Sequence, residues 1–264
     1  MIKLYELLKE QVGQPKAIIL AGAPGAGKGY VLKGLDLGNV KVLNVDNRYI
    51  DNLKKANVSL DLKNSSPEDR SKQAIAMSQA NKDFDKDVED TIKAKESFIL
   101  DGTAASYKKT EELKNELEEA GYEVFMLYVY TDLERSLKQN QDRFEKSDGK
   151  DRSLAPAIVL RTWKDVTSNF KPYKEMFGDN FVSVANTLED EKIDNLEDII
   201  DKYLTPFKPK NTKPKTAARQ RYADKQKEKL NKEIKVLLDG GAEEIITTSV
   251  SADEARAKIN MFLK

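Results

Sequence analysis

The 264-residue sequence contains no cysteine and no histidine. Without cysteine, the chain has no disulfide, no thiolate nucleophile and no cysteine-based zinc or iron–sulfur site. Without histidine, it has no Ser–His relay, no imidazole base and no histidine-ligated metal. Acid–base and metal chemistry must therefore use carboxylates, lysine, arginine, tyrosine, hydroxyls and the backbone. This restriction favours phosphate chemistry with a hard cation such as Mg²⁺, which prefers oxygen ligands.

An excess of charge of one sign is also absent, because 45 Lys and Arg balance 45 Asp and Glu. The net charge thus indicates neither a nucleic acid nor a membrane surface as a partner. No apolar run approaches the roughly 20 residues of a membrane span. The segment Met1–Gln11 alternates charges with leucines, which is typical of an amphipathic helix and not of a secretion signal. We therefore expect a cytoplasmic protein with no membrane partner.

Short apolar segments alternate with longer helical patterns. Their continuous apolarity, as in Ala17–Leu20, suits strands that helices cover on both faces. The predicted strands are Lys16–Ala21, Lys41–Val45, Ser97–Leu100, Tyr122–Tyr130 and Asn180–Val184, and the predicted helices are Lys28–Leu35, Pro67–Lys95, Lys108–Ala120, Asp132–Phe144, Ala155–Met176 and Leu188–Leu204. This alternation predicts an α/β fold with a three-layer parallel sheet.

The composition changes after Leu204. Residues 205–215 hold three prolines and four lysines without periodicity, which is typical of a stiff linker. A charged helix from Thr216 to Leu238, a strand Ile245–Val250 and a helix Ala252–Leu263 are expected to follow. The predicted division is a main domain over 1–204, a linker over 205–215 and a small C-terminal appendage over 216–264.

The segment 206–236 is strongly basic, with 11 Lys and Arg against 3 Asp and Glu. Clustered lysine can attract a nucleic acid through counterion release. Alternatively, the helix is simply solvated, with Leu230, Ile234 and Leu237 docking on a neighbouring surface. Only Tyr222 interleaves as an aromatic, which is poor for stacking on single strands. Both interpretations stay open.

A glycine-rich loop stands between the first predicted strand and the next helix. It reads Gly22-Ala23-Pro24-Gly25-Ala26-Gly27-Lys28-Gly29, and Tyr30 follows. The glycines allow positive φ and let backbone N–H groups close around phosphate oxygens. The helix N-terminus adds its positive end, and Lys28 adds a point charge for the β- and γ-phosphates. Such turns also serve tight packing alone, but the strand–loop–helix context predicts that residues 22–30 bind ATP.

One position departs from the usual pattern, in which a Ser or Thr hydroxyl after the lysine reaches Mg²⁺. Here that residue is Gly29, and the next one is Tyr30. Mg²⁺ would then be held by phosphates, water and a carboxylate elsewhere. The departure weakens the prediction of a metal site more than the prediction of nucleotide binding.

Two aspartates, Asp46 and Asp101, directly follow the second and third predicted strands. Since the carboxyl ends of strands line the ligand crevice of an open α/β sheet, both should lie beside the loop. There Asp46 can accept a proton from an attacking hydroxyl or orient Mg²⁺. The apolar strand that ends in Asp101 resembles the second nucleotide motif of such enzymes, in which the carboxylate meets Mg²⁺ through water. Either aspartate can instead merely cap the helix that follows. Arg48 and Thr103 are candidate substrate contacts, Arg48 for an acceptor phosphate.

Four arginines lie in or around the polar segment Glu145–Lys150, which joins two predicted helices. Arginine suits bidentate phosphate contacts and the charge of a phosphoryl transition state. A mobile lid that carries arginines would also exclude water, a competing acceptor. Arg143 and Arg152 flank this predicted lid and are assigned to catalysis. Arg135 and Arg161 can equally belong to a charged helical surface.

The motifs GAPGAGKG, NVDNR, ILDGT, Arg143-Phe144-Glu145 and Arg152 occur in the order seen in small P-loop kinases. Over about residues 16–203 the chain resembles the zeta-toxin-like and phage polynucleotide kinase-like group, and its loop resembles that of the adenylate kinases. The resemblance implies a P-loop NTPase fold of the nucleotide kinase type, with ATP and Mg²⁺. It also implies that Asp46 is the general base, that Lys28 binds ATP, and that Arg143 and Arg152 hold phosphates.

The resemblance to adenylate kinases stops after the third predicted strand. Thr103, Ala104 and Ala105 stand where those enzymes have Phe-Pro-Arg. The missing arginine argues against AMP as a straightforward acceptor.

The sequence therefore predicts an ATP-dependent phosphotransferase. Its acceptor would be a hydroxyl of a nucleotide-like molecule, a sugar nucleotide or a polynucleotide 5′ end. Two alternatives stay open, a nucleoside monophosphate kinase and a non-catalytic ATP-binding switch or assembly protein. Gly29 is the feature that keeps the second alternative open.

Overall fold

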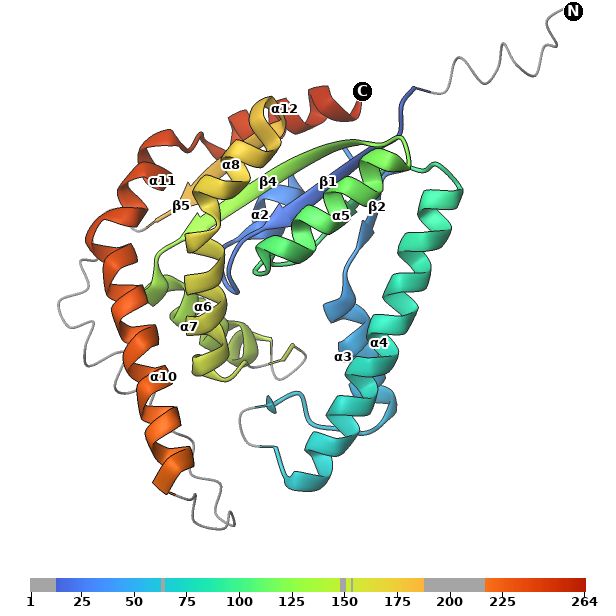
Figure 1. The fold of residues 1–264 in the computed structure, drawn as a ribbon. Helices are drawn as coiled ribbons and strands as arrows, with labels where there is room; N and C mark the ends of the chain where they lie inside the picture. Colours follow the sequence, from blue (N-terminus) through green and yellow to red (C-terminus); the bar gives the residue numbers. More distant parts are fainter. Residues whose placement is uncertain (1–12, 63–64, 148–150, 153, 188–216) are drawn as a thin grey trace, which may run out of the picture.

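A computed structural model describes residues 13–62, 65–147, 151–152, 154–187 and 217–264. Five strands form one parallel sheet in the order β2-β3-β1-β4-β5 (Figure 1). The strands are β1 (Lys16–Ala21), β2 (Lys41–Leu43), β3 (Phe98–Leu100), β4 (Glu123–Thr131) and β5 (Phe181–Asn186). The predicted α/β fold with a parallel sheet is thereby confirmed.

The central strand β1 pairs with β4 on one side and with β3 on the other. The register runs from Lys16↔Glu123 to Ala21↔Tyr128 in the first pair and begins at Ala17↔Phe98 in the second. Nearly every residue of β1 and β4 is buried, which explains why these segments are apolar without alternation. Because all five strands are parallel, their carboxyl ends meet at one edge of the sheet.

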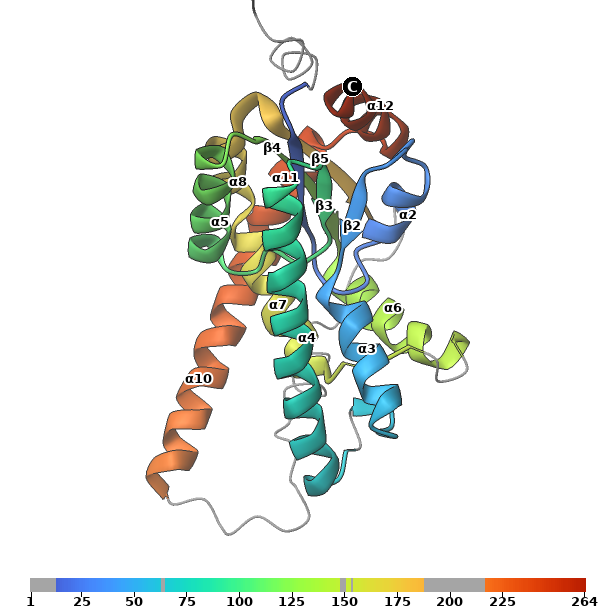
Figure 2. The same cartoon turned by 90° about the vertical axis from the view of Figure 1, so that its right-hand side faces the viewer.

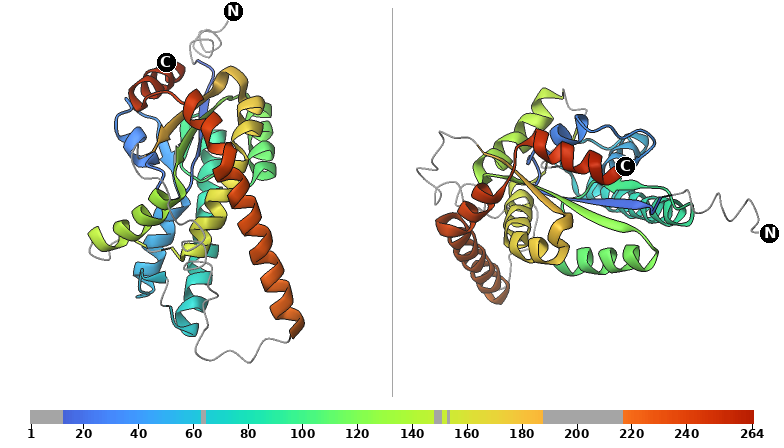
Figure 3. Two further views of the ribbon diagram at one scale, coloured as in Figure 1. Left: turned by 90° about the vertical axis from the view of Figure 1, so that its left-hand side faces the viewer. Right: turned by 90° about the horizontal axis from the view of Figure 1, so that it is seen from above.

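Helices cover both faces of the sheet (Figures 1 and 3). They are α2 (Lys28–Lys33), α3 (Val45–Lys55), α4 (Pro67–Lys93), α5 (Tyr107–Glu119), α6 (Leu133–Lys146), α7 (Pro156–Ser168), α8 (Phe170–Phe177), α10 (Ala217–Val236), α11 (Ala242–Thr248) and α12 (Ala252–Leu263), with a 3₁₀ turn at Gly178–Asn180 and a π turn at Leu237–Gly241. On one face, α5, α7 and α8 pack around buried Tyr128 and Trp163. On the other face, α2 and α12 pack against Ile18 and Leu20.

The helices α3 and α4 form a hairpin with a small hydrophobic cluster of its own, which includes Leu53 and Ala80. Ser66 caps α4 through the N–H of Asp69, as its position before Pro67 predicts. The N-terminal half of α4 extends away from the sheet (Figure 2). Only its later residues, such as Phe84, pack against the main core. The hairpin is thus attached to the sheet at one end.

Two element boundaries differ from the sequence prediction. The predicted helix Ala155–Met176 is divided into α7 and α8 at Asn169. Pro172 has no N–H to donate to the turn before it, so the α7 ladder cannot continue unbroken. The predicted strand Lys41–Val45 ends at Leu43, because Asn44 caps α3, a helix for which the sequence analysis gave no residue range.

The predicted strand Ile245–Val250 is wrong, because residues 242–248 form α11. Ile245 is buried in the core beside α10, so packing outweighs the strand preference of β-branched residues. Only Val250 adopts a strand-like pairing, a single parallel bridge to Val184. The predicted helix Ala252–Leu263 is confirmed as α12.

The C-terminal helices complete the cores of the sheet. Ile234 and Ile245 belong to the cluster on one face, and Ala255 and Phe262 belong to the cluster on the other. The domain boundaries stay a prediction, but α10–α12 are built around the same cores as the sheet. The predicted segments Met1–Gln11, Leu188–Leu204 and 205–215 lie outside the described residues. Of the helices described, none has the length and apolar composition needed to cross a membrane.

Candidate active site

The glycine-rich loop (Gly22–Gly29) connects the end of β1 to α2. Gly25 and Gly27 have φ values of 77° and 89°, in the left-handed region that favours glycine. A Cβ on Gly25 would lie 2.9 Å from the Ser136 carbonyl oxygen, and one on Gly27 would lie 2.6 Å from Asn186 Nδ2. Larger residues therefore fit at neither position without displacing α6 or the end of β5.

The backbone N–H groups of the loop are available to a ligand. Those of Gly25, Gly27, Lys28 and Gly29 take part in none of the backbone–backbone hydrogen bonds among the described residues. They gather at the N-terminus of α2, where the helix dipole favours negative charge. This arrangement fits the phosphates of a nucleotide.

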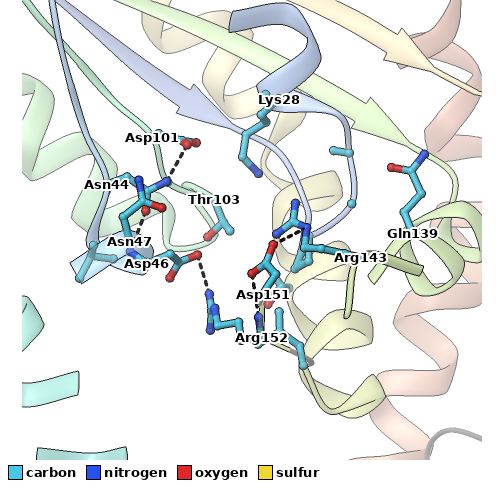
Figure 4. A pocket seen from close by; sticks show the side chains of 18 of the residues that line it. Lys28, Asn44, Asp46, Asn47, Asp101, Thr103, Gln139, Arg143, Asp151 and Arg152 are labelled. Carbon is cyan, nitrogen blue, oxygen red and sulfur yellow. Dashed lines mark hydrogen bonds and ion pairs between the residues drawn. The ribbon is translucent and has the colours of Figure 1, made fainter. Parts of the chain in front are cut away.

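Lys28 extends from α2 back along the loop. Its Nζ donates to the carbonyl oxygens of Gly22 at 2.7 Å and Ala23 at 3.3 Å. Burial lowers the pKa of Lys28 to about 8; Asp101 and Asp46 oppose that shift, whereas Arg143 adds to it. The ammonium group thus lies between carboxylates and an arginine (Figure 4).

The aspartates Asp46 and Asp101 lie at neighbouring strand ends and are linked by Asn44. The Oδ1 of Asn44 accepts the N–H of Asp46 at 2.6 Å, and its Nδ2 donates to Oδ2 of Asp101 at 2.6 Å. Asn44 is therefore the N-cap of α3, and Ser106 caps α5. The alternative that either aspartate is a helix cap is wrong, because Asn44 and Ser106 occupy the cap positions and both aspartates line the cavity.

Arg152 and Arg143 approach the same cavity from the opposite side (Figure 4). Arg152 Nη2 lies 2.5 Å from Asp46 Oδ2, and its guanidinium carbon lies 5.8 Å from the centre of the Tyr49 ring. Arg143, near the end of α6, pairs with Asp151 at 3.5 Å. Burial raises the pKa of Tyr49, and the charge of Arg152 opposes that rise.

Two residues of α6 contact the loop, and the sequence reasoning missed both. Ser136 Oγ donates to the Pro24 carbonyl oxygen at 2.6 Å. The Gln139 amide, oriented to satisfy its neighbours, donates to the Gly25 carbonyl at 2.6 Å and accepts from Arg135 Nε at 2.8 Å. Residues 136, 139 and 143 lie on one helix face because of their spacing. Since Arg143 was predicted to reach the site, this spacing could have indicated that Ser136 and Gln139 lie near it too.

The three other arginines considered in the sequence analysis do not join Arg143 and Arg152 at this cavity. Arg48 forms an ion pair with Asp87 of α4 and does not line the cavity. Arg135 lines a second hollow of about 400 Å³ beside Gly25. Arg161 is exposed on α7.

The cavity at the carboxyl edge of the sheet has a volume of about 670 Å³. The predicted residues that line it are Pro24, Gly25, Ala26, Gly27, Lys28, Gly29, Tyr30, Asp46, Asp101, Thr103, Arg143 and Arg152. Thr103 is further fixed by its carbonyl oxygen, which accepts the N–H of Gly22 at 3.1 Å. A cavity lined by charged side chains of both signs suits a phosphorylated ligand together with a cation.

A divalent cation would find carboxylates here but not a complete set of protein ligands. Within the part of the chain that the structure describes, no three Asp or Glu side chains gather to hold a metal ion. Asp46 and Asp101 nonetheless line one cavity, and Gly29 supplies no side-chain oxygen. This fits Mg²⁺, which keeps several waters and takes phosphate oxygens as ligands.

The parallel sheet, its flanking helices and the loop after β1 define a protein with the fold of the P-loop kinases. A family model described as Zeta toxin matches residues 3–195. The chain therefore belongs to the zeta toxin family, and the resemblance inferred from the motifs is confirmed.

Several solved structures are similar to this chain at low identity. The AvrRxo1-ORF1:-ORF2 complex is 16% identical with a TM-score of 0.52, covering 96% of this chain and 82% of that one. The AvrRxo1-ORF1:AvrRxo1-ORF2 structure with ATP is 15% identical with a TM-score of 0.50, covering 97% and 83%. A structure of the PezAT chromosomal toxin–antitoxin system of Streptococcus pneumoniae is 15% identical with a TM-score of 0.45, covering 86% and 90%. No curated protein matches the chain.

Proposed function

We propose that the chain is an ATP-dependent phosphotransferase that moves the γ-phosphate of ATP to a hydroxyl group. The observation that carries the proposal is the convergence on one cavity of the loop amides, Lys28, Asp46, Asp101, Arg143 and Arg152. Membership of the zeta toxin family supports a kinase-like enzyme. The similar fold that was solved with ATP supports ATP as the donor.

The roles follow from where the groups lie. The loop amides and Lys28 would hold the β- and γ-phosphates at the N-terminus of α2. Mg²⁺, when bound, neutralises phosphate charge, and Asp46 and Asp101 are the side chains that would reach its waters. Arg143 and Arg152 would stabilise the charge on the transferring phosphoryl group.

Asp46 is the proposed general base. An acceptor oxygen forms a bond to the γ-phosphorus while the bond from that phosphorus to the β–γ bridging oxygen breaks. The hydroxyl proton passes to the Asp46 carboxylate, and ADP leaves with the bridging oxygen. For this step the Asp46–Arg152 ion pair must open, which frees the carboxylate for the hydroxyl and the guanidinium for phosphate.

The proposed acceptor is a nucleotide-like molecule, a sugar nucleotide or a polynucleotide 5′ end. Ala104 and Ala105, which follow Thr103 at the cavity, bring no arginine to an acceptor phosphate. This favours a hydroxyl acceptor over a nucleoside monophosphate. Arg48 stays a predicted acceptor contact, which would require it to leave Asp87.

The test is transfer of labelled γ-phosphate from ATP to a panel of nucleosides, nucleoside monophosphates, UDP-sugars and 5′-hydroxyl oligonucleotides. Asp46→Asn is run beside it, with Asp51→Asn, an exposed aspartate on the same helix, as the control. We expect transfer to one class, lost by a factor of about 10² or more in Asp46→Asn only. ATP binding without transfer to any acceptor would instead support a nucleotide-binding switch.

The basic segment 206–236 is a proposed contact for nucleic acid. In its described part, Lys229 and Lys232 form helix-surface ion pairs with Glu233 and Glu228. These pairs reduce the charge left for a polyanion. Replacing the exposed lysines of α10 by glutamine should weaken RNA and DNA binding if this proposal is right, and unchanged affinity would overturn it.

A further inference from the structure

The helix α12 lies on α2, the helix that the glycine-rich loop opens (Figures 2 and 3). It belongs to residues 196–264, beyond the segment that the family model matches. Ala255, Ile259 and Phe262 anchor α12 on the sheet by burial. Arg256, between these anchors, faces α2 and is only 15% exposed.

The guanidinium of Arg256 donates hydrogen bonds to carbonyl oxygens near the C-terminal end of α2. Its Nη2 donates to the Tyr30 carbonyl oxygen at 2.8 Å, and its Nε donates to the Val31 carbonyl oxygen at 3.1 Å. Because α2 has six residues, its last carbonyls lack full intrahelical pairing. A cation at this end also complements the helix dipole.

Three further contacts show that α2 and α12 are fitted to each other. A Cβ on Gly34 would lie 2.4 Å from Arg256 Nε, so the space that glycine leaves is filled by the guanidinium. The guanidinium also lies 4.8 Å from the centre of the Tyr30 ring, which is 69% exposed beside the cavity. Asn260 Oδ1 accepts the N–H of Asp36, just after α2, at 3.2 Å.

We propose that Arg256 is a positioning residue of the nucleotide site, acting through α2. It fixes the end of the short helix whose other end presents Lys28 and the loop amides to phosphate. Because Ala255, Ile259 and Phe262 bury α12 against the sheet, we expect α12 to stay in place without Arg256. The effect on ATP rests on the proposed function, whereas the effect on α2 does not.

The experiment compares Arg256→Ala, Arg256→Lys and Gly34→Ala with the full chain. Lys258→Ala is the matched control, because Lys258 is on α12 and pairs with Glu254 of the same helix at the surface. Hydrogen exchange of the α2 amides is measured without nucleotide, and the Kd for ATP with Mg²⁺ is measured separately. Exchange of β1 and β4 reports global stability in every variant.

We expect Arg256→Ala to speed exchange in residues 30–35 about tenfold and to weaken ATP binding by a similar factor, since two helix-end hydrogen bonds are lost. Arg256→Lys should recover part of the exchange protection and part of the ATP affinity, because lysine keeps the charge but cannot donate to both carbonyls as the guanidinium does. Gly34→Ala should reproduce Arg256→Ala, because its Cβ expels the guanidinium, and should add nothing in the Arg256→Ala background.

Unchanged α2 exchange and unchanged ATP affinity in Arg256→Ala would overturn the inference. Equal acceleration across β1, β4 and α2 would also overturn it, because that result describes a general loss of stability. If the full chain binds no ATP, the proposed function fails, and the exchange data still decide whether Arg256 fixes α2.

Discussion

The Asp46 carboxylate and the Arg152 guanidinium form an ion pair across the cavity, with Oδ2 and Nη2 2.5 Å apart. The two residues come from opposite walls, Asp46 from the first turn of α3 and Arg152 from the segment between α6 and α7. The proposed general base and a proposed phosphate contact thus neutralise each other in this structure. A phosphorylated ligand that attracts Arg152 would release Asp46 for proton transfer.

Removing Arg152 should therefore impair transfer more than nucleotide binding. We expect Arg152→Ala to lower kcat by about 10²-fold or more, since a charge-stabilising contact to the phosphoryl group is lost. Arg152→Lys should recover only part of kcat, because lysine lacks the planar fork. Steady-state kinetics with Arg161→Ala, an exposed arginine of α7, as the control would measure this. Equal kcat in Arg152→Ala and the control would contradict the role.

The lowered pKa of Lys28 predicts that ATP affinity falls in alkaline solution. In the free protein Lys28 loses its proton as the pH rises through about 8. Phosphate favours the protonated form, so binding is strongest below that pH and weakens above it. We expect a five- to tenfold loss of affinity between about pH 7.5 and 9, measured by calorimetric titration. Lys28→Arg, which stays charged, should bind without this dependence; a dependence that persists there belongs to another group.

Gly29 can be tested by supplying the missing hydroxyl. Its backbone has no positive φ, and a Cβ there would meet nothing within 4 Å. Gly29→Ser should therefore fit, and its hydroxyl should lower the Mg²⁺ concentration for half-maximal transfer by about threefold or more. Gly29→Ala is the control, since it should raise the free energy of unfolding by about 0.5 kcal/mol without changing the Mg²⁺ requirement. An identical Mg²⁺ requirement in both variants would show that position 29 does not face the metal.

Asn44 has two roles: it caps α3, and it donates a hydrogen bond that orients Asp101. Two substitutions separate these roles. Asn44→Ala should lower the free energy of unfolding by about 1 kcal/mol, because the cap of α3 is lost. Asn44→Ser keeps a capping oxygen but is too short to donate to Asp101, so stability should largely return while transfer stays about tenfold reduced. Chemical denaturation and transfer assays measure the two effects. Full activity in Asn44→Ser would mean that Asp101 needs no support from Asn44.

The parts of the fold that the sequence predicts best are those with an unambiguous local pattern. The apolar runs of β1 and β4 and the Ser66–Pro67 start of α4 fall within two residues of their predicted places. Where local preference and packing disagree, prediction fails. Ile245 and its neighbours have strand-forming side chains, yet the core beside α10 holds them in a helix.

In the candidate site, too, local sequence patterns predict some residues, whereas contacts made by packing could not be predicted. The loop and both aspartates were recognisable because they follow strands whose carboxyl ends must meet. The partners that orient them were not, because Ser136, Gln139 and Arg256 reach the loop and α2 from helices far along the chain. Nor did the sequence reveal that Arg48 pairs with Asp87, since that contact depends on how α3 packs on α4.

The position of Phe262 has a consequence for the order of folding. Its ring lies 4.9 Å from that of Phe125 on β4, and it closes the hydrophobic cluster that β1 begins with Ile18 and Leu20. During synthesis, α2 therefore covers only part of this face of the sheet until the residues of α12 have left the ribosome. Chains that stop short of this helix would expose the apolar side chains that α12 covers to chaperones and proteases. Their glycine-rich loop would already be synthesised, but α2 would lack its contacts with α12.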